Sequence, residues 1–259
     1  MDLGLKDKVV IVTGGTKGIG AGIVRRMAEE EAIVICVNRP GKEGAVMEQE
    51  LKEKGQRMEY IAAELTEIPE CKRVIDTVKE KYGRIDVIIN NAGHNNQIPL
   101  SAEPEEFVKG MRDNIVHFFS LVHYAYDELV KNGGNVVNIG SHVSVTGQGM
   151  TSAYAAAKGG ICGLTREWAA HFCDKGVRVN CIIPGSVWTS SYEKWAKLFP
   201  DPAARRRQAE QNIPFGRRMT TVEEFADLVT FVASERAGHL TGEIIINDGG
   251  YSHLDRVLT

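Results

Sequence analysis

The sequence contains no apolar run that approaches the roughly 18 residues needed for a membrane-spanning helix. It has only 8 prolines, and no Gly-X-Y period accompanies its 27 glycines, which excludes collagen-like and Pro/Gly-rich disordered chains. Neither sign of charge dominates, because 31 Lys and Arg stand against 34 Asp and Glu. Such a balance gives no electrostatic footprint for nucleic acid or an anionic membrane surface. We therefore expect a globular protein with neither nucleic-acid nor membrane partners.

Targeting and metal-binding signals are also lacking. The first residues hold no apolar signal-peptide core and lead directly into a β-rich run. The 5 cysteines are odd in number, widely spaced and set in apolar segments, without a Cys-x-x-Cys pair. This usage is typical of reduced core thiols, and no His, Cys or Asp grouping has metal-ligand spacing. We expect a cytoplasmic protein without a structural metal.

Short apolar runs alternate with longer segments of helical periodicity along the whole chain. The predicted strands are 9–13, 33–37, 58–62, 87–90, 135–139, 177–183 and 243–247. The predicted helices are 19–30, 42–54, 67–81, 104–131, 152–173 and 222–234. This alternation predicts an α/β fold: a doubly wound, Rossmann-type parallel sheet of about seven strands with helices on both faces, in one domain over 1–259. Segment 188–218, with two tryptophans and clustered arginines, breaks the rhythm and is predicted to be an irregular lid over a substrate.

A glycine-rich turn, Thr13-Gly14-Gly15-Thr16-Lys17-Gly18-Ile19-Gly20, joins the first predicted strand to the first helix. Glycines let backbone N–H groups approach a pyrophosphate, and a helix N-terminus adds partial positive charge. The spacing G-x-x-x-G-x-G is neither the common G-x-G-x-x-G nor a P-loop. A tight turn without a ligand is the alternative, but the position between strand and helix favours a dinucleotide.

The turn resembles that of the short-chain dehydrogenase/reductase family, and four further motifs follow in the family's order. They are Asn90-Asn91-Ala92-Gly93, the Asn of 111–114, Ser141 with Tyr154-x-x-x-Lys158, and Pro184-Gly185-x-x-x-Thr189. The resemblance covers essentially the whole chain. It implies a catalytic tetrad of Asn114, Ser141, Tyr154 and Lys158 and an NAD(P)-dependent hydride transfer at a CH–OH group.

The spacing of the last two tetrad residues suits such chemistry. Tyr154 and Lys158 are four residues apart on a predicted helix, so both side chains lie on one face. A free tyrosine, with a pKa of ~10, is a poor base at neutral pH. The Lys158 ammonium and the charge of an oxidised nicotinamide both favour the phenolate. Ser141 would stabilise charge that develops on the substrate oxygen, and the resemblance implies that Asn114 orders a proton-relaying water chain.

The resemblance also implies a set of cofactor contacts. They are Gly14, Thr16, Lys17, Gly18, Ile19, Gly20, Asn38, Arg39, Glu64, Leu65, Asn91, Ala92, Gly93, Tyr154, Lys158, Pro184, Gly185, Val187 and Thr189. Many NAD-preferring members carry an acidic residue where Asn38 stands. Because this chain has none, and Lys17 and Arg39 can meet a 2′-phosphate, we expect NADP to be preferred, with NAD remaining open. Glu64 stands where the family usually has Asp.

The segments around the expected site are polar and aromatic, which suits a polyhydroxylated ligand better than a steroid or an acyl chain. The candidate substrate contacts are His94, Asn95, His142, Gln148, Trp188 and Trp195. For His94 and His142, a hydrogen-bonded loop residue is an equally good interpretation.

Three stretches, 146–154, 164–169 and 248–256, are similar to those of bacterial L-fucose dehydrogenases within this family. Those enzymes oxidise an aldopyranose at C1 to its lactone, and the family resemblance implies a homotetramer. The alternatives are an NAD(P)H-dependent reductase of another carbonyl, such as a 3-oxoacyl thioester or a keto-sugar acid, and a non-catalytic dinucleotide sensor. The intact Ser141, Tyr154 and Lys158 argue against the sensor, since a pure binder needs no base.

Overall fold

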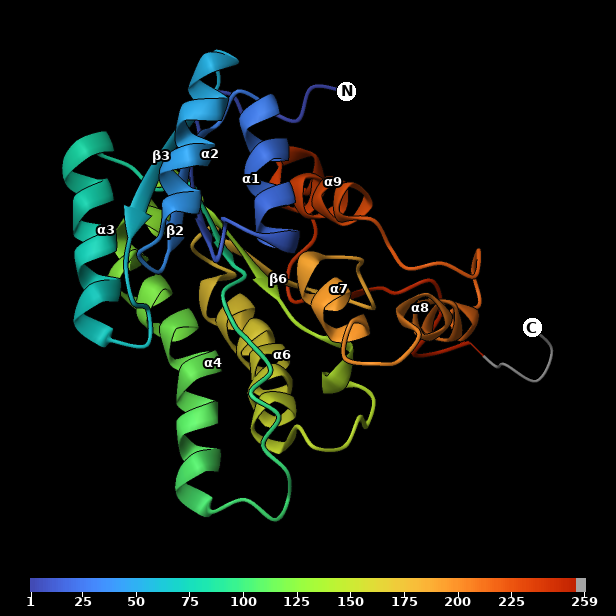
Figure 1. The fold of residues 1–259 in the computed structure, drawn as a ribbon. Coiled ribbons are helices and arrows are strands. Elements are labelled where there is room, and N and C mark those ends of the chain that lie inside the picture. Colours follow the sequence, from blue (N-terminus) through green and yellow to red (C-terminus); the bar gives the residue numbers. More distant parts are fainter. Residues whose placement is uncertain (255–259) are drawn as a thin grey trace.

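Seven parallel strands form one sheet at the centre of the protein, which a computed structural model describes for residues 1–254 (Figure 1). The strand order is β3-β2-β1-β4-β5-β6-β7. The strands are β1 (Val9–Thr13), β2 (Ile33–Asn38), β3 (Arg57–Ala62), β4 (Val87–Asn90), β5 (Asn135–Ile139), β6 (Arg178–Pro184) and β7 (Ile244–Asn247). The chain reverses its direction of winding between β1 and β4, and ligands bind open α/β sheets outside the strand ends at such a point. The predicted doubly wound, single-domain sheet is therefore confirmed.

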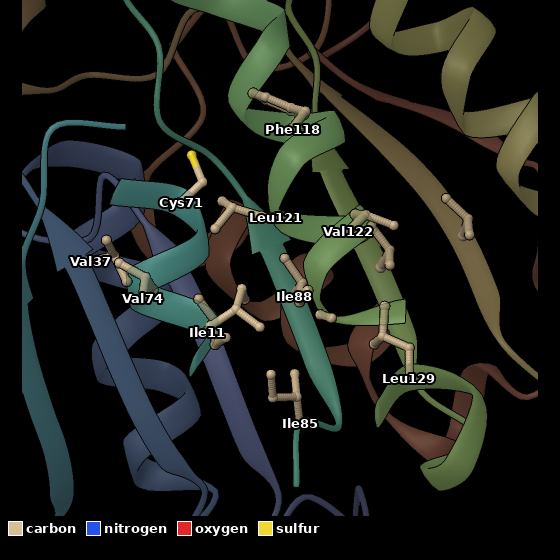
Figure 2. Packing of buried hydrophobic residues seen from close by; sticks show 14 of the residues in the cluster. Ile11, Val37, Cys71, Val74, Ile85, Ile88, Phe118, Leu121, Val122 and Leu129 are labelled. Atoms are coloured by element: carbon tan, nitrogen blue, oxygen red, sulfur yellow. The ribbon is translucent and has the colours of Figure 1, made fainter. Parts of the chain in front are cut away.

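Helices cover both faces of the sheet, as the continuous apolar strands require. One face packs against α1 (Gly18–Glu29), α2 (Lys42–Glu53) and α9 (Val222–Ala233). The other face packs against α3 (Ile68–Tyr82), α4 (Pro104–Tyr124) and α6 (Ser152–Phe172). Figure 2 shows Leu121 of α4 beside strand residues Ile11 and Ile88, and Phe118 and Val122 of the same helix belong to the same cluster. Burial of each such side chain contributes about 1.5–3 kcal/mol, so this core holds the strand ends in place.

The predicted helix 104–131 is in fact two helices, α4 and α5 (Tyr126–Asn132). Ala125 leaves the helical conformation, with φ −89° and ψ 0°, and no glycine or proline marks the break. Leu121 before it and Leu129 after it are both fully buried. The apolar period thus continues through a bend that sequence alone did not indicate.

The predicted irregular insert is mostly helical, which corrects that expectation. It contains α7 (Ser190–Ala196) and α8 (Pro202–Gln211), which Figure 1 shows to one side of the sheet, away from α2 and α3. Asp201 caps α8 by accepting a hydrogen bond from the Ala204 N–H at 2.9 Å, and Pro202 follows at the first helical position. An isolated parallel β-bridge between Val187 and Thr220 joins the residues that flank the segment.

The cysteines are all free thiols, but only Cys36, Cys71 and Cys181 are buried in the core. Cys162 is half-buried, and Cys173 is exposed because it lies just past the last buried turn of α6, so the expectation of core thiols is wrong for Cys173. Across residues 1–254, no helix has the length and apolarity to cross a bilayer. Residues 255 and 256 of the similar tail stretch lie outside the described part of the chain.

Candidate active site

The glycine turn and the Asn-Asn-Ala-Gly motif meet at the carboxyl ends of β1 and β4. The Thr13 hydroxyl accepts hydrogen bonds from the N–H groups of Asn91 at 2.9 Å and Ala92 at 3.0 Å. In return, the Asn91 side-chain amide donates to the Thr13 carbonyl at 2.8 Å and to the Gly14 carbonyl at 3.2 Å. Thr13 was not among the predicted site residues, although its place directly before the first glycine of the motif was the available signal.

The glycine turn leaves room only for backbone. Gly14 has φ +65°, and a Cβ there would lie 2.9 Å from Ala92 Cα. A Cβ on Gly20 would lie 2.2 Å from the Gly14 carbonyl oxygen. No side chain caps the N-terminus of α1, so its first N–H groups face outward with the positive end of the helix. A backbone cradle of this kind fits the diphosphate of a dinucleotide.

The four predicted tetrad residues come from three parts of the chain: Asn114 from α4, Ser141 from the loop after β5, and Tyr154 and Lys158 from α6. Lys158 is 2% exposed, and its Nζ donates to the Ile139 carbonyl at the end of β5 at 2.8 Å. Asn114 of α4 is fully buried, and its Oδ1 accepts a hydrogen bond from the His94 N–H at 2.9 Å. A Cβ on Gly93 would lie 3.1 Å from Asn114 Oδ1 and 3.6 Å from Lys158 Nζ. A side chain at this position would therefore crowd both polar groups.

The other half of the tetrad is a hydrogen-bonded pair of hydroxyls. Burial raises the pKa of the Tyr154 phenol, and a hydrogen bond with Ser141 opposes that rise. Lys158 Nζ lies 5.7 Å from the centre of the Tyr154 ring and 5.1 Å from that of Phe118. Burial also lowers the pKa of Lys158 to about 8. Without a ligand, the protein therefore keeps the phenol protonated at neutral pH.

The segment after β6 closes the site from the side of the predicted lid. A Cβ on Gly185 would lie 2.5 Å from Asp248 Cβ, so only glycine fits beside the end of β7. A Cβ on Gly18 would lie 3.3 Å from Thr189 Cγ2. This contact places the Pro-Gly-x-x-x-Thr segment, with buried Val187, against the N-terminus of α1.

The end of β2 carries the groups predicted to contact the adenosine end of a cofactor. The Asn38 side-chain amide donates to the Arg39 carbonyl at 3.3 Å, and Arg39 is exposed. Lys17 of the glycine turn forms an ion pair with Glu43, with 2.7 Å between Nζ and Oε1. Glu43 was not predicted, because nothing in the sequence shows that the first turn of α2 reaches the glycine turn.

At the neighbouring strand end, the Glu64 carboxylate accepts a hydrogen bond from the Thr66 hydroxyl at 3.1 Å, and Leu65 is buried. Both residues follow β3, next to β2 in the sheet. Ala63 ties the two strand ends together, because its N–H donates to the Asn38 carbonyl at 2.9 Å.

The predicted substrate residues lie in different surroundings. His142 is half-buried, hydrogen-bonds to the Pro184 carbonyl, and stacks edge-on against Tyr251 at 5.8 Å; burial lowers its pKa. Trp188 and Trp195 stack with arginines of α8: Arg206 lies 4.0 Å from the Trp188 ring and Arg205 lies 4.9 Å from the Trp195 ring. These two arginines thus join the lid helices.

The remaining predicted substrate residues, His94, Asn95 and Gln148, are exposed. Asn95 caps its own loop, since its side-chain oxygen accepts the Gln97 N–H at 3.0 Å. Tyr192 of α7, which donates to Ser186 Oγ at 3.1 Å and interacts electrostatically with Tyr154, lies closer to the tetrad. The part of the chain that the structure describes holds no group of three or more His, Cys, Asp or Glu arranged for a metal ion.

Comparison with known proteins agrees with this geometry. Residues 14–252 match the family model described as enoyl-(acyl carrier protein) reductase. The chain is 36% identical to the L-fucose dehydrogenase of Bos taurus over 94% of its length and 88% of the relative. It is 30% identical to the 3-oxoacyl-[acyl-carrier-protein] reductase FabG of Thermotoga maritima, over 95% and 98%.

Solved structures of dehydrogenases and reductases share the fold along nearly the whole chain. The crystal structure of Cj0485 dehydrogenase has 38% identity and a TM-score of 0.96, over 100% of this chain and 99% of that one. L-sorbose reductase from Gluconobacter frateurii, in complex with NADPH and L-sorbose, has 25% identity and a TM-score of 0.94, over 98% and 100%. The chain belongs to the short-chain dehydrogenase/reductase family. It is an NAD(P)-dependent oxidoreductase of that family, with L-fucose dehydrogenases among its relatives.

Proposed function

We propose that the protein oxidises the C1 hydroxyl of an aldopyranose, such as L-fucose, to the lactone, with NADP preferred over NAD. The observation that carries this proposal is the convergence of Asn114, Ser141, Tyr154 and Lys158 beside the glycine cradle. Similarity to an L-fucose dehydrogenase along 94% of the chain, and to a reductase described with NADPH and L-sorbose, supports a sugar substrate.

The catalytic roles follow from the positions of the four side chains. When bound, the nicotinamide supplies the hydride acceptor. Tyr154 takes the proton of the C1 hydroxyl, and Ser141, which contacts the phenol, donates a hydrogen bond to the same substrate oxygen. For Tyr154 to act near neutral pH, its pKa must fall by ~3 units, which corresponds to about 4 kcal/mol.

Lys158 contributes to that fall because its buried ammonium lies near the phenol and has no carboxylate partner within residues 1–254. It also binds the ribose hydroxyls. Asn114, which holds the His94 N–H, orders the water that carries the proton outward.

The cofactor preference rests on the end of β2. Asn38 brings no carboxylate to this strand end, and the cations Lys17, which is paired with Glu43, and Arg39 are available to receive a 2′-phosphate. The remaining cofactor contacts are those predicted from sequence, with the Asn91 and Gly93 loop and the 184–189 segment around the nicotinamide.

The segment 188–218 acts as the lid of a polar and aromatic substrate pocket. His142, Trp188 and Trp195 are its candidate contacts, and His94, Asn95 and Gln148 complete the list from exposed loops. The protein works as a cytoplasmic homotetramer, for which the small residues of 153–163 on α6 allow close helix packing.

A second candidate is the NAD(P)H-dependent reduction of another carbonyl. The specific observation in its favour is the 30% identity with a 3-oxoacyl-[acyl-carrier-protein] reductase over 98% of that relative. The same four residues serve this reaction in reverse, with Tyr154 as the proton donor.

Steady-state assays with NADP and NAD against L-fucose, its epimers and a 3-oxoacyl thioester test both candidates. We expect oxidation of L-fucose, and a kcat about 10²–10⁴ lower in Tyr154→Phe with NADPH binding retained. Tyr126→Phe is the matched control, because Tyr126 stacks on Phe172 at 5.3 Å outside the tetrad. Turnover by Tyr154→Phe within about tenfold of the unmodified protein would contradict the assignment. Activity with the thioester and with none of the sugars would favour the second candidate, the reduction of another carbonyl.

A further inference from the structure

An ion pair joins the glycine turn to the start of α2, and one of its members, Lys17, is a residue to which the proposed function assigns the 2′-phosphate. Lys17 Nζ is 2.7 Å from Glu43 Oε1, and the two residues belong to the glycine turn and to the first turn of α2. The hydrogen bond from Lys17 lowers the pKa of the Glu43 carboxyl, which is therefore ionised at neutral pH. The carboxylate is folded back over the β2–α2 turn, where Glu43 Oε2 comes within 2.7 Å of the position of a Cβ on Gly41.

We infer that Glu43 is a specificity-determining residue that weakens binding of the 2′-phosphorylated cofactor by occupying Lys17, and so keeps the preference for NADP over NAD small. This inference rests on the proposed function, in which Lys17 and Arg39 receive the 2′-phosphate. It adds a residue that acts against that preference.

The charges around the pair explain why the effect falls on one cofactor only. Arg39 and Lys42 are exposed on the same turn, and within residues 1–254 the Arg39 guanidinium has no carboxylate partner. A phosphate makes strong charge-assisted hydrogen bonds to such cations. To reach Lys17 it must displace the Glu43 carboxylate or lie beside it, and either arrangement costs affinity.

The 2′-hydroxyl of NAD carries no charge. It meets no repulsion from Glu43 and needs no cation from Lys17, so NAD affinity does not depend on whether the ion pair is intact. The pair is more than half exposed on the lysine side, so water screens the interaction and the effect is moderate.

The test is a fluorescence titration of the full chain with NADPH and, separately, with NADH. We expect Glu43→Gln to lower the Kd for NADPH about fivefold while the Kd for NADH stays unchanged, with a smaller gain at high salt. Glu50→Gln is the matched control. Glu50 lies on the same helix and pairs with Arg25 at 2.7 Å, so its loss removes an equal charge away from the cradle.

The inference is overturned if Glu43→Gln and Glu50→Gln change the ratio of the Kd for NADPH to the Kd for NADH equally. It is also overturned if Glu43→Gln changes the Kd for NADH rather than that for NADPH. Lys17→Met separates this result from the proposed function. If Lys17→Met and Arg39→Met leave NADPH binding intact, the 2′-phosphate assignment itself is wrong. If they weaken NADPH binding but Glu43→Gln does not strengthen it, only the role of Glu43 fails.

Discussion

Replacing Lys158 with methionine should leave the cofactor-free protein at least as stable as the unmodified protein near neutral pH, although it removes a group that we propose to be catalytic. Burial lowers the pKa of Lys158 from 10.5 to about 8. Holding the ammonium charged in the fold therefore costs about 3 kcal/mol relative to the unfolded chain. Methionine of similar length removes this cost, and loses the hydrogen bond to the Ile139 carbonyl, worth about 1–2 kcal/mol.

The pH dependence of this difference is the sharper result. Below a pH of about 8, Lys158 is charged in both states and the full cost applies; between there and about 10.5 it is charged only when unfolded, so the cost disappears. Raising the pH from about 7 to about 10 should thus stabilise the unmodified protein relative to Lys158→Met by about 2.5 kcal/mol. Urea unfolding of both proteins at the two pH values measures this double difference, in which all other titrating groups cancel. A stability gap that does not move with pH would refute the reasoning.

Two further predictions concern the cradle and the acid limit of stability. Gly20→Ala forces a Cβ to within 2.2 Å of the Gly14 carbonyl, so NADPH binding should weaken by more than about tenfold in a fluorescence titration; unchanged binding would show that the cradle is not the cofactor site. Burial lowers the pKa of His117 from 6.5 to about 4, so the unfolded chain takes up a proton at a higher pH than the folded protein does. Stability therefore falls by about 3 kcal/mol as the pH decreases through that interval. His117→Gln keeps a donor for the Ala92 carbonyl but cannot titrate, and urea unfolding should show a smaller acid loss than in the unmodified protein. An equal loss in both proteins would assign the acid sensitivity to other groups.

The strands could be predicted almost residue by residue, because a sheet covered on both faces requires continuous apolar runs such as Val9–Thr13. Three members of the candidate tetrad were equally accessible, since Ser141 follows a strand and Tyr154 and Lys158 share one helix face, whereas Asn114 within α4 was indicated only by the family resemblance. The bend at Ala125 was not, because the apolar period passes through it without a glycine or proline. The helical structure of the lid could not be predicted either. Because α8 buries none of its residues, no apolar stripe indicated a helix there, although Asp201 and Pro202 are a helix-start signal.

Long-range contacts between loops were the other part that the sequence could not supply. Lys17 and Glu43 each look like ordinary surface charges until the fold brings the β2–α2 turn beside the glycine turn. Thr189 and Gly18 meet in the same way, across most of the chain. Local patterns specify each element and its strand end, whereas contacts between strand ends depend on the order 3-2-1-4-5-6-7 in the sheet.

The tetrad also shows why this site needs a rigid setting. Lys158 is nearly fully buried, and among residues 1–254 its ammonium is satisfied by a backbone carbonyl and aromatic faces rather than by a carboxylate. A carboxylate would stabilise the charge, but in the proposed mechanism it would also cancel the field that lowers the pKa of Tyr154. The free energy gained by packing the core on the sheet offsets the cost of burying this unpaired charge. Asn138, which precedes Ile139 on β5, accepts a hydrogen bond from Asn90 of β4 and donates one to Thr165 of α6, each at 3.0 Å, and these bonds fix the strand end beside Lys158. The proposed activity and the stability cost of Lys158 therefore both follow from one arrangement.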